Sequence, residues 1–169
     1  MSTPVRVWIA AAFYPVYRCG GWALVRNVQG VVSGMAGGER HSTGMRVALA
    51  GLAAGLQGLP VSADAVEIQT TSPELAALAA FLSAPQAPGV KPPGAKPPGD
   101  DGADLDFWAQ ILTAAKGRRL SVVAVAPQPK TPAAFAGAWA DLARDKAKAT
   151  GPFTAAIPKP NLAKVQGLG

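Results

Sequence analysis

The sequence predicts one α/β domain built on a five-stranded mixed sheet flanked by helices. Three strand-like runs come first along the chain, and we expect them to form an antiparallel meander. Two later strand-like runs alternate with helical stretches, which is typical of strands that join a sheet in parallel through helical crossovers. The 169 residues, 49% of them hydrophobic, are sufficient for a single core. We expect the domain to span residues 1–150 and residues 151–169 to form an irregular C-terminal tail.

The meander is predicted by three short runs rich in β-branched and aromatic residues. They are Val5–Ile9, Trp22–Arg26 and Val31–Met35. The turn between the second and third runs contains Gly30, which can adopt the positive φ that a tight hairpin requires. After Ile9 the alternation of polar and apolar residues gives way to three alanines, and we expect the first strand to end there.

Helices and strands alternate in the middle of the chain. Apolar residues at helical spacing predict a helix over about Thr43–Gln57, and Val66–Thr70 predicts a fourth strand. The next helix is expected to begin at Ser72, whose hydroxyl can cap free backbone amides, with Pro73 at the first helical position. This helix carries Leu75, Leu78 and Leu82.

Residues 83–103 differ in composition from the rest of the domain. They include the repeat "GVKPPGAKPPG", and prolines without backbone donors mixed with glycines do not form a packed element. We expect an inserted loop, which is either a spacer or a polyproline II ligand for an aromatic groove. The α/β pattern then resumes with a helix from Leu105, a strand over Val122–Ala126 and a last helix capped by Thr131.

Charge and cysteine content limit the partners and the compartment. Sixteen Lys and Arg against ten Asp and Glu give a net charge of +6, which favours polyanions or serves solubility. The single cysteine, Cys19, excludes an internal disulfide framework and fits a reducing compartment. No leader pattern and no apolar run of about 18 residues is present. We therefore expect a cytoplasmic protein without a membrane association.

The order of elements and several local stretches together resemble type I ribonuclease H over about residues 5–147. The stretches that carry the resemblance are "CGGWALV", "HSTGMRVALAGLAAGL", "VEIQTTSPELAAL", "DLDFWAQIL" and "WADLARDKA". The resemblance implies a ribonuclease H-like fold. It also implies an ancestry among enzymes that cut the RNA strand of an RNA–DNA hybrid with two magnesium ions held by about four carboxylates.

The four positions that correspond to these carboxylates hold other residues here, namely Ala10, Arg46, Thr71 and Ala140. Magnesium requires hard oxygen ligands, and a guanidinium at its site repels it. A shift of one residue in the last helix would replace Ala140 by Asp141, but one carboxylate does not build a two-metal site. We therefore expect a pseudoenzyme with no catalytic residues, no metal site and no cofactor.

The remaining expectation is a nucleic-acid-associated module that binds an RNA–DNA hybrid, a duplex or another polyanion. The candidate contacts are Arg18, Arg40, Arg46 and Lys130. Arg46 is either a phosphate ligand or an ion-paired surface arginine. Tyr14 and Tyr17 either stack on bases or cover the end of the sheet. The alternatives are a scaffold that holds a protein partner or a second copy of itself, and residual ribonuclease H activity.

Overall fold

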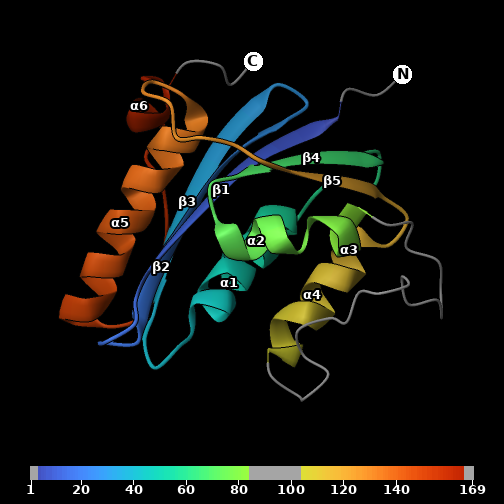
Figure 1. Cartoon of the computed structure of the whole chain (residues 1–169). Helices are drawn as coiled ribbons and strands as arrows, with labels where there is room; N and C mark the ends of the chain where they lie inside the picture. Colours follow the sequence, from blue (N-terminus) through green and yellow to red (C-terminus); the bar gives the residue numbers. More distant parts are fainter. Residues whose placement is uncertain (1–3, 84–103, 166–169) are drawn as a thin grey trace.

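A single six-stranded sheet organises the computed structural model, which describes residues 4–83 and 104–165. The strand order across the sheet is β5-β4-β1-β2-β3-β6 (Figure 1). β1 pairs antiparallel with β2, β2 with β3, and β3 with β6, whereas β4 pairs parallel with both β1 and β5. The strands are β1 Val5–Tyr14, β2 Cys19–Val28, β3 Val31–Glu39, β4 Ala65–Thr70, β5 Arg119–Ala124 and β6 Phe153–Ala156.

Helices cover both faces of this sheet (Figure 1). One face carries α1 with α2, α3 and α4, while α5 lies across β1, β2 and β3 on the other face, where the short α6 also packs. Each face has its own apolar core, and α5 contributes mainly alanines to the second one. The helices are α1 Gly44–Leu56, α2 Pro73–Ala77, α3 Ala79–Ser83, α4 Leu105–Ala115, α5 Pro132–Thr150 and α6 Lys159–Leu162.

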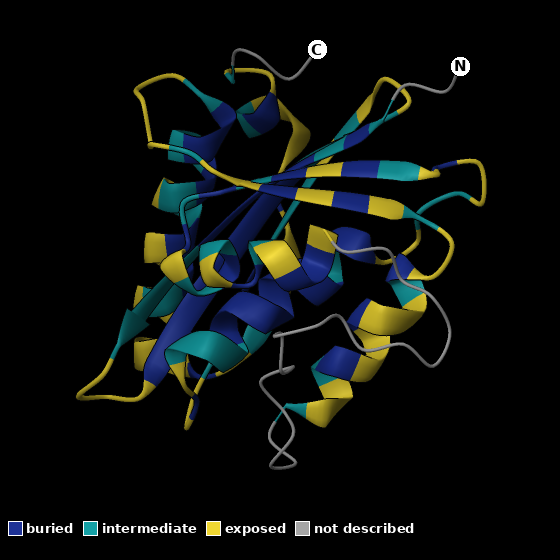
Figure 2. Cartoon of the chain, turned by 45° about the vertical axis from the view of Figure 1, so that its right-hand side comes forward, coloured by how far each residue is buried: buried dark blue, intermediate teal, exposed yellow. Residues whose placement is uncertain are grey.

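Local capping residues start the helices as the sequence predicts. The Ser72 hydroxyl accepts a hydrogen bond from the Leu75 amide at 3.3 Å, and the Thr131 hydroxyl accepts one from the Ala134 amide at 3.3 Å. The helix expected after Ser72 is interrupted at Leu78, so it forms two short helices, α2 and α3. Figure 2 shows buried residues along the central strands and on the sheet-facing side of α1.

The first strand is longer than predicted. β1 runs through the three alanines to Tyr14, because its hydrogen-bonded pairing with β2 continues as far as Tyr14 opposite Cys19. Ala10 therefore lies in the middle of a strand and not at its end. The loss of alternation between polar and apolar residues does not mark the end of β1, because this part of the strand packs against a helix that requires small side chains.

The expected count of five strands and the expected irregular tail are both wrong. Phe153–Ala156 forms β6 against the edge strand β3, and α6 follows it. Ile157 and Leu162, which are 4% and 5% exposed, then pack into the apolar core beneath α5. Four residues are too few to show a strand period, so this strand depends on its pairing partner.

Two other expectations concern the inserted loop and the membrane. The proline- and glycine-rich loop expected over 83–103 lies outside the described residues, apart from Ser83 at the end of α3. Within the described ranges, no helix combines the length and the apolar character needed to cross a membrane.

Candidate functional site

Two of the four positions that the resemblance aligns with carboxylates lie together where α5 contacts the sheet. Ala10 on β1 is paired with Ala23 on β2, and both belong to the apolar cluster that includes Ala140 of α5. Ala10 is 2% exposed and Ala140 is 1% exposed. The sheet and the helix thus meet through methyl groups at this point, and neither position offers an oxygen atom from a side chain.

The helix lies so close to the sheet here that larger side chains do not fit. A Cβ added to Gly21 on β2 would lie 2.5 Å from the carbonyl oxygen of Ala140 and would overlap the backbone of Ala143 and Arg144. The absence of a side chain at Gly21 is therefore what permits α5 to rest on β2. The space between β1, β2 and α5 is filled by this packing.

The third position follows the end of β4. The Thr71 amide donates a hydrogen bond to the Ile9 carbonyl at 3.4 Å, and the buried Thr70 hydroxyl donates to the same carbonyl at 2.9 Å. The Thr70 hydroxyl also accepts a hydrogen bond from the Ser72 amide at 2.9 Å. The polar groups at this strand end therefore join β4 to β1 and begin α2.

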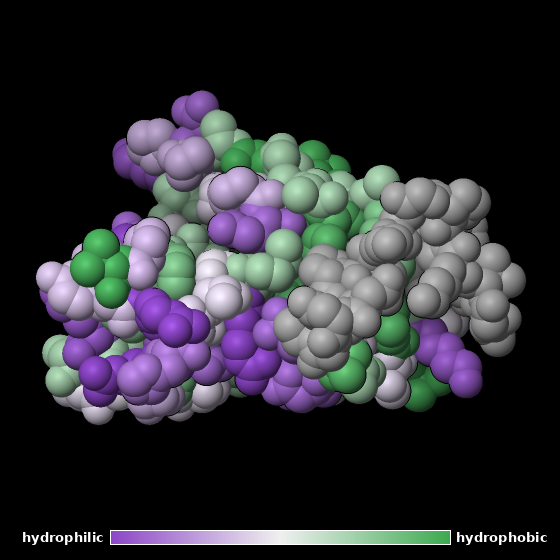
Figure 3. Space-filling view, turned by 60° about the horizontal axis from the view of Figure 1, so that its bottom comes forward, coloured by the Kyte–Doolittle hydropathy of each residue, from purple (hydrophilic) through white to green (hydrophobic). Residues whose placement is uncertain are grey.

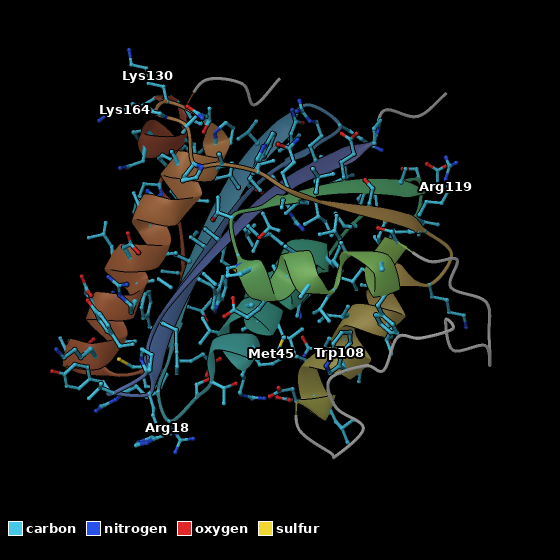
Figure 4. The ribbon with its side chains drawn as sticks, in the orientation of Figure 1. Arg18, Met45, Trp108, Arg119, Lys130 and Lys164 are labelled. Atoms are coloured by element: carbon cyan, nitrogen blue, oxygen red, sulfur yellow. The ribbon has the colours of Figure 1, made fainter. Side chains whose placement is uncertain are left out.

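The second position, Arg46, lies on α1, on the sheet face opposite α5. Its guanidinium forms a bidentate ion pair with Asp106, at 2.9 Å from Nη1 to Oδ1 and 2.8 Å from Nη2 to Oδ2. Nη1 also lies 3.1 Å from Oδ1 of Asp104, and the guanidinium stacks 4.4 Å from the ring centroid of Phe107. Arg46 thereby connects α1 to the first turn of α4, in the part of the molecule where Figure 4 labels Met45 of α1 and Trp108 of α4.

The electrostatics of this arrangement stabilise both charges. The hydrogen bonds from Arg46 lower the pKa of Asp106 below its ordinary value, and the same bonds raise the pKa of the guanidinium. Asp104 occupies the N-cap position of α4, but its side chain makes no capping bond and instead binds Arg46. Partial burial raises the pKa of the nearby Glu39 carboxyl, an effect that the charge of Arg46 opposes.

Carboxylates do not gather into a metal site in the described part of the chain. Within it, no group of three or more His, Cys, Asp or Glu side chains is arranged to hold an ion. Asp141, the neighbour that a one-residue shift would substitute for Ala140, has 60% of its side chain exposed and lies 3.7 Å from Arg144. Its side chain therefore lies on the solvent side of α5, whereas Ala140 lies against the sheet.

The four predicted nucleic-acid contacts fall in three different places. Arg18 lies in the turn between β1 and β2. The carbonyl oxygen of Arg18 accepts a hydrogen bond at 3.0 Å from the amide of Ser42, which is two residues after Arg40. These two arginines therefore belong to neighbouring loops. Arg46 is occupied by its ion pairs on α1, and Lys130 precedes α5 at the opposite end of the molecule from Arg18 (Figure 4).

A cluster of cations stacked on aromatic rings was not predicted as a site. The Arg144 guanidinium lies 4.0 Å from the centroid of the Tyr14 ring, and the Lys148 ammonium lies 3.8 Å from that of Tyr17. The Tyr14 hydroxyl donates a hydrogen bond to Asp145 at 2.7 Å, which raises the pKa of Tyr14 and lowers the pKa of Asp145. The charged spacing of Arg144 and Lys148 on α5 was visible in the sequence, but the partner rings on the hairpin were not.

The comparisons with known proteins concern the fold. A solved structure of the N-terminal ribonuclease H domain of Rv2228c from Mycobacterium tuberculosis, fused to maltose-binding protein, is similar to this chain with a TM-score of 0.62. The similarity covers 88% of this chain and 97% of that one, at 19% sequence identity. The chain has a ribonuclease H-like fold. No family model matches the sequence, and no curated protein matches it.

Proposed function

We propose that this protein binds nucleic acid through a ribonuclease H-like fold and does not cleave it. The observation that carries the proposal is the state of Arg46, which stands where the resemblance places a metal-binding glutamate. A guanidinium held by two carboxylates has a fixed positive charge, so it neither binds magnesium nor leaves those carboxylates free to do so.

The other former carboxylate positions support the same conclusion. A two-metal mechanism needs oxygen donors on both sides of the ions, which lie about 3.5–4 Å apart. Ala10 and Ala140 supply methyl groups in a contact where α5 rests directly on β2. Restoring carboxylates there would require the helix to move away from the sheet.

Nucleic-acid binding is supported by charge and by surface chemistry. The net charge of +6 attracts a polyanion, and exposed basic residues lie in two loops and along the C-terminal half of α5. The single buried thiol of Cys19 agrees with a reducing, cytoplasmic environment, where nucleic acid is available.

The proposal is tested by fluorescence anisotropy with a labelled RNA–DNA hybrid, a DNA duplex and single strands, each titrated at several salt concentrations. We expect the logarithm of the binding constant to fall linearly with the logarithm of the salt concentration, because phosphate contacts release counterions. Flat anisotropy at low salt with every probe contradicts the proposal. Self-association measured by light scattering under those conditions would then favour the scaffold alternative.

A further inference from the structure

We propose that the end of the molecule formed by the β1–β2 hairpin and the C-terminal half of α5 binds single-stranded nucleic acid. We call this surface the hairpin–α5 end, and it consists of Tyr14, Tyr17, Arg18, Arg40, Arg144, Lys146 and Lys148. The inference rests on the proposed function, because it names the surface and the form of nucleic acid that this function uses.

An aromatic ring at this end is exposed to solvent, with the Lys148 ammonium over it. Tyr17 lies at the tip of the hairpin and is 58% exposed, although it is one of the larger apolar rings of the chain. Its ring meets that of Tyr14 edge to face, with centroids 6.0 Å apart and an interplanar angle of 83°. Stacking of a base on such a ring stabilises a complex by about 1–3 kcal/mol and depends little on sequence.

The hairpin holds this ring in place before any ligand binds. β1 and β2 stay paired as far as Tyr14 opposite Cys19, so the turn between them is short. The hydrogen bond from the Tyr14 hydroxyl to Asp145 fixes the base of the turn to α5. A preorganised ring loses little conformational freedom on binding, and this favours affinity.

Positive charge surrounds the two tyrosines. Five basic side chains at this end outnumber the acidic ones, because Asp141 and Asp145 both pair with Arg144, at 3.7 and 3.4 Å, and Glu39 precedes Arg40. Lys148 lies over Tyr17, and Lys146 lies 4.4 Å from the ring centroid of Phe153. Neither lysine forms an ion pair with another described residue, so both charges remain available to phosphates. Figure 3, which looks toward this end, shows mostly hydrophilic surface there, with some hydrophobic side chains exposed among it.

The arrangement suits a single strand better than a duplex. A base stacks on a protein ring only when it is free of its own neighbours, which is the normal state of single strands and loops. A ring at a protruding hairpin tip with lysines beside it places a base and the adjacent phosphates on one surface. In a duplex the bases are enclosed, so Tyr17 would contribute little.

The opposite end of the molecule provides a matched control. Lys130 and Lys164 line a hollow of about 260 Å³ next to the start of α5, far from Arg18 (Figure 4). They supply the same charge as Lys146 and Lys148. The ring beside them, Phe135, is only partly exposed and packs against Trp139.

The experiment compares four variants by anisotropy with labelled oligothymidylate, oligouridylate and a duplex of equal length. Tyr17→Ala should weaken binding of the single strands by about tenfold. Tyr17→Phe should bind within about twofold of wild type, because it keeps the ring. The double variant Lys146→Ala/Lys148→Ala should make the slope of the logarithm of the binding constant against the logarithm of the salt concentration shallower by about 1–2. The double variant Lys130→Ala/Lys164→Ala should change this slope much less. Circular dichroism melts confirm that each variant is folded.

The outcomes separate the inference from the function beneath it. Wild-type binding that Tyr17→Ala leaves unchanged, or equal effects of the two lysine pairs, overturns the inference and leaves the proposed function standing. Tighter binding of the duplex than of either single strand also overturns it. Failure of the wild-type protein to bind any probe overturns both.

Discussion

The N-terminal and C-terminal parts of α5 make different contacts. The part up to Ala143 meets the sheet through Ala133, Ala136, Ala140 and Ala143, which are all buried. The part from Arg144 onward carries cations that lie on aromatic rings of the hairpin and of β6. Under the proposed function, the first part serves packing and the second part carries the charge. The position that the resemblance assigns to a catalytic carboxylate and the proposed binding surface therefore lie on different parts of the same helix.

The largest effect is expected from returning a carboxylate to the packed stretch. Ala140→Asp should lower the free energy of unfolding by about 3–5 kcal/mol, because an unpaired charge is buried between α5 and β2. Urea denaturation measures the loss. Ala138→Asp is the matched control, since Ala138 is exposed on the same helix, and it should cost less than about 1 kcal/mol. Equal losses, or recovery of Ala140→Asp on addition of magnesium, would show that this contact still accommodates an ion.

A somewhat smaller loss of stability is expected from weakening the packing of the segment that follows α5. Ile157→Ala should lower the free energy of unfolding by about 2–4 kcal/mol, because it leaves a cavity beneath α5 and β3. Val61→Ala, at a side chain that is 99% exposed, is the control and should be nearly neutral. If both variants unfold at the same urea concentration as wild type, the segment after Gly151 does not belong to the cooperative unit.

Breaking the Arg46 ion pairs should have a moderate and pH-dependent effect. Arg46→Met should cost about 1 kcal/mol at neutral pH, since Asp106 is half exposed and solvent weakens the pair. The pKa of Asp106 is lowered below 3.8 in the folded protein, so its stabilisation is complete above 3.8 and is lost as the pH falls through the folded value. Denaturation of wild type and variant between neutral and acidic pH should therefore show a difference that shrinks in acid.

Arg40→Met is the control for that experiment. Arg40 is exposed and forms no ion pair within the described residues, so its loss should change stability little at any pH. A difference for Arg46→Met that stays constant or grows below pH 3.8 contradicts the ion-pair account.

The smallest effect concerns the tyrosine that supports the charged stretch. The hydrogen bond to Asp145 raises the pKa of Tyr14 above 10.0, so Asp145→Asn should return the pKa toward that value. The chain has two tyrosines, so a Tyr17→Phe background leaves Tyr14 as the single phenol to titrate by ultraviolet absorbance. Asp141→Asn should leave the titration nearly unchanged. A wild-type pKa at or below 10.0 contradicts the hydrogen bond.

Local chemistry made much of the fold predictable. Ser72 with Pro73, and Thr131 with Pro132, mark helix starts because a cap and a fixed φ act on neighbouring residues alone. β6 was not predictable, since Phe153–Ala156 has no period of its own and depends on β3. The three alanines after Ile9 led to a predicted strand end that was wrong, because hydrogen-bonded pairing with β2 continues β1 through them.

The candidate site was less predictable than the fold, because its contacts join residues far apart in the chain. Arg46 could be recognised as a charge reversal at a resembled position, but its partners Asp104 and Asp106 lie 58 and 60 residues away. The stacking of Arg144 on Tyr14 likewise requires α5 to pass the hairpin. Lys130 and Arg18 were both candidate contacts, and the fold places them at opposite ends of the molecule.

The measurement that tests the central claim most directly is a cleavage assay on a bound RNA–DNA hybrid. The RNA strand carries a fluorophore, the protein is added at a concentration that saturates the anisotropy signal, and magnesium or manganese is supplied. The account predicts that the hybrid is bound and that the RNA stays intact. Steady cleavage that Asp141→Asn abolishes would contradict the account, because Asp141 on the solvent side of α5 would then be a catalytic residue.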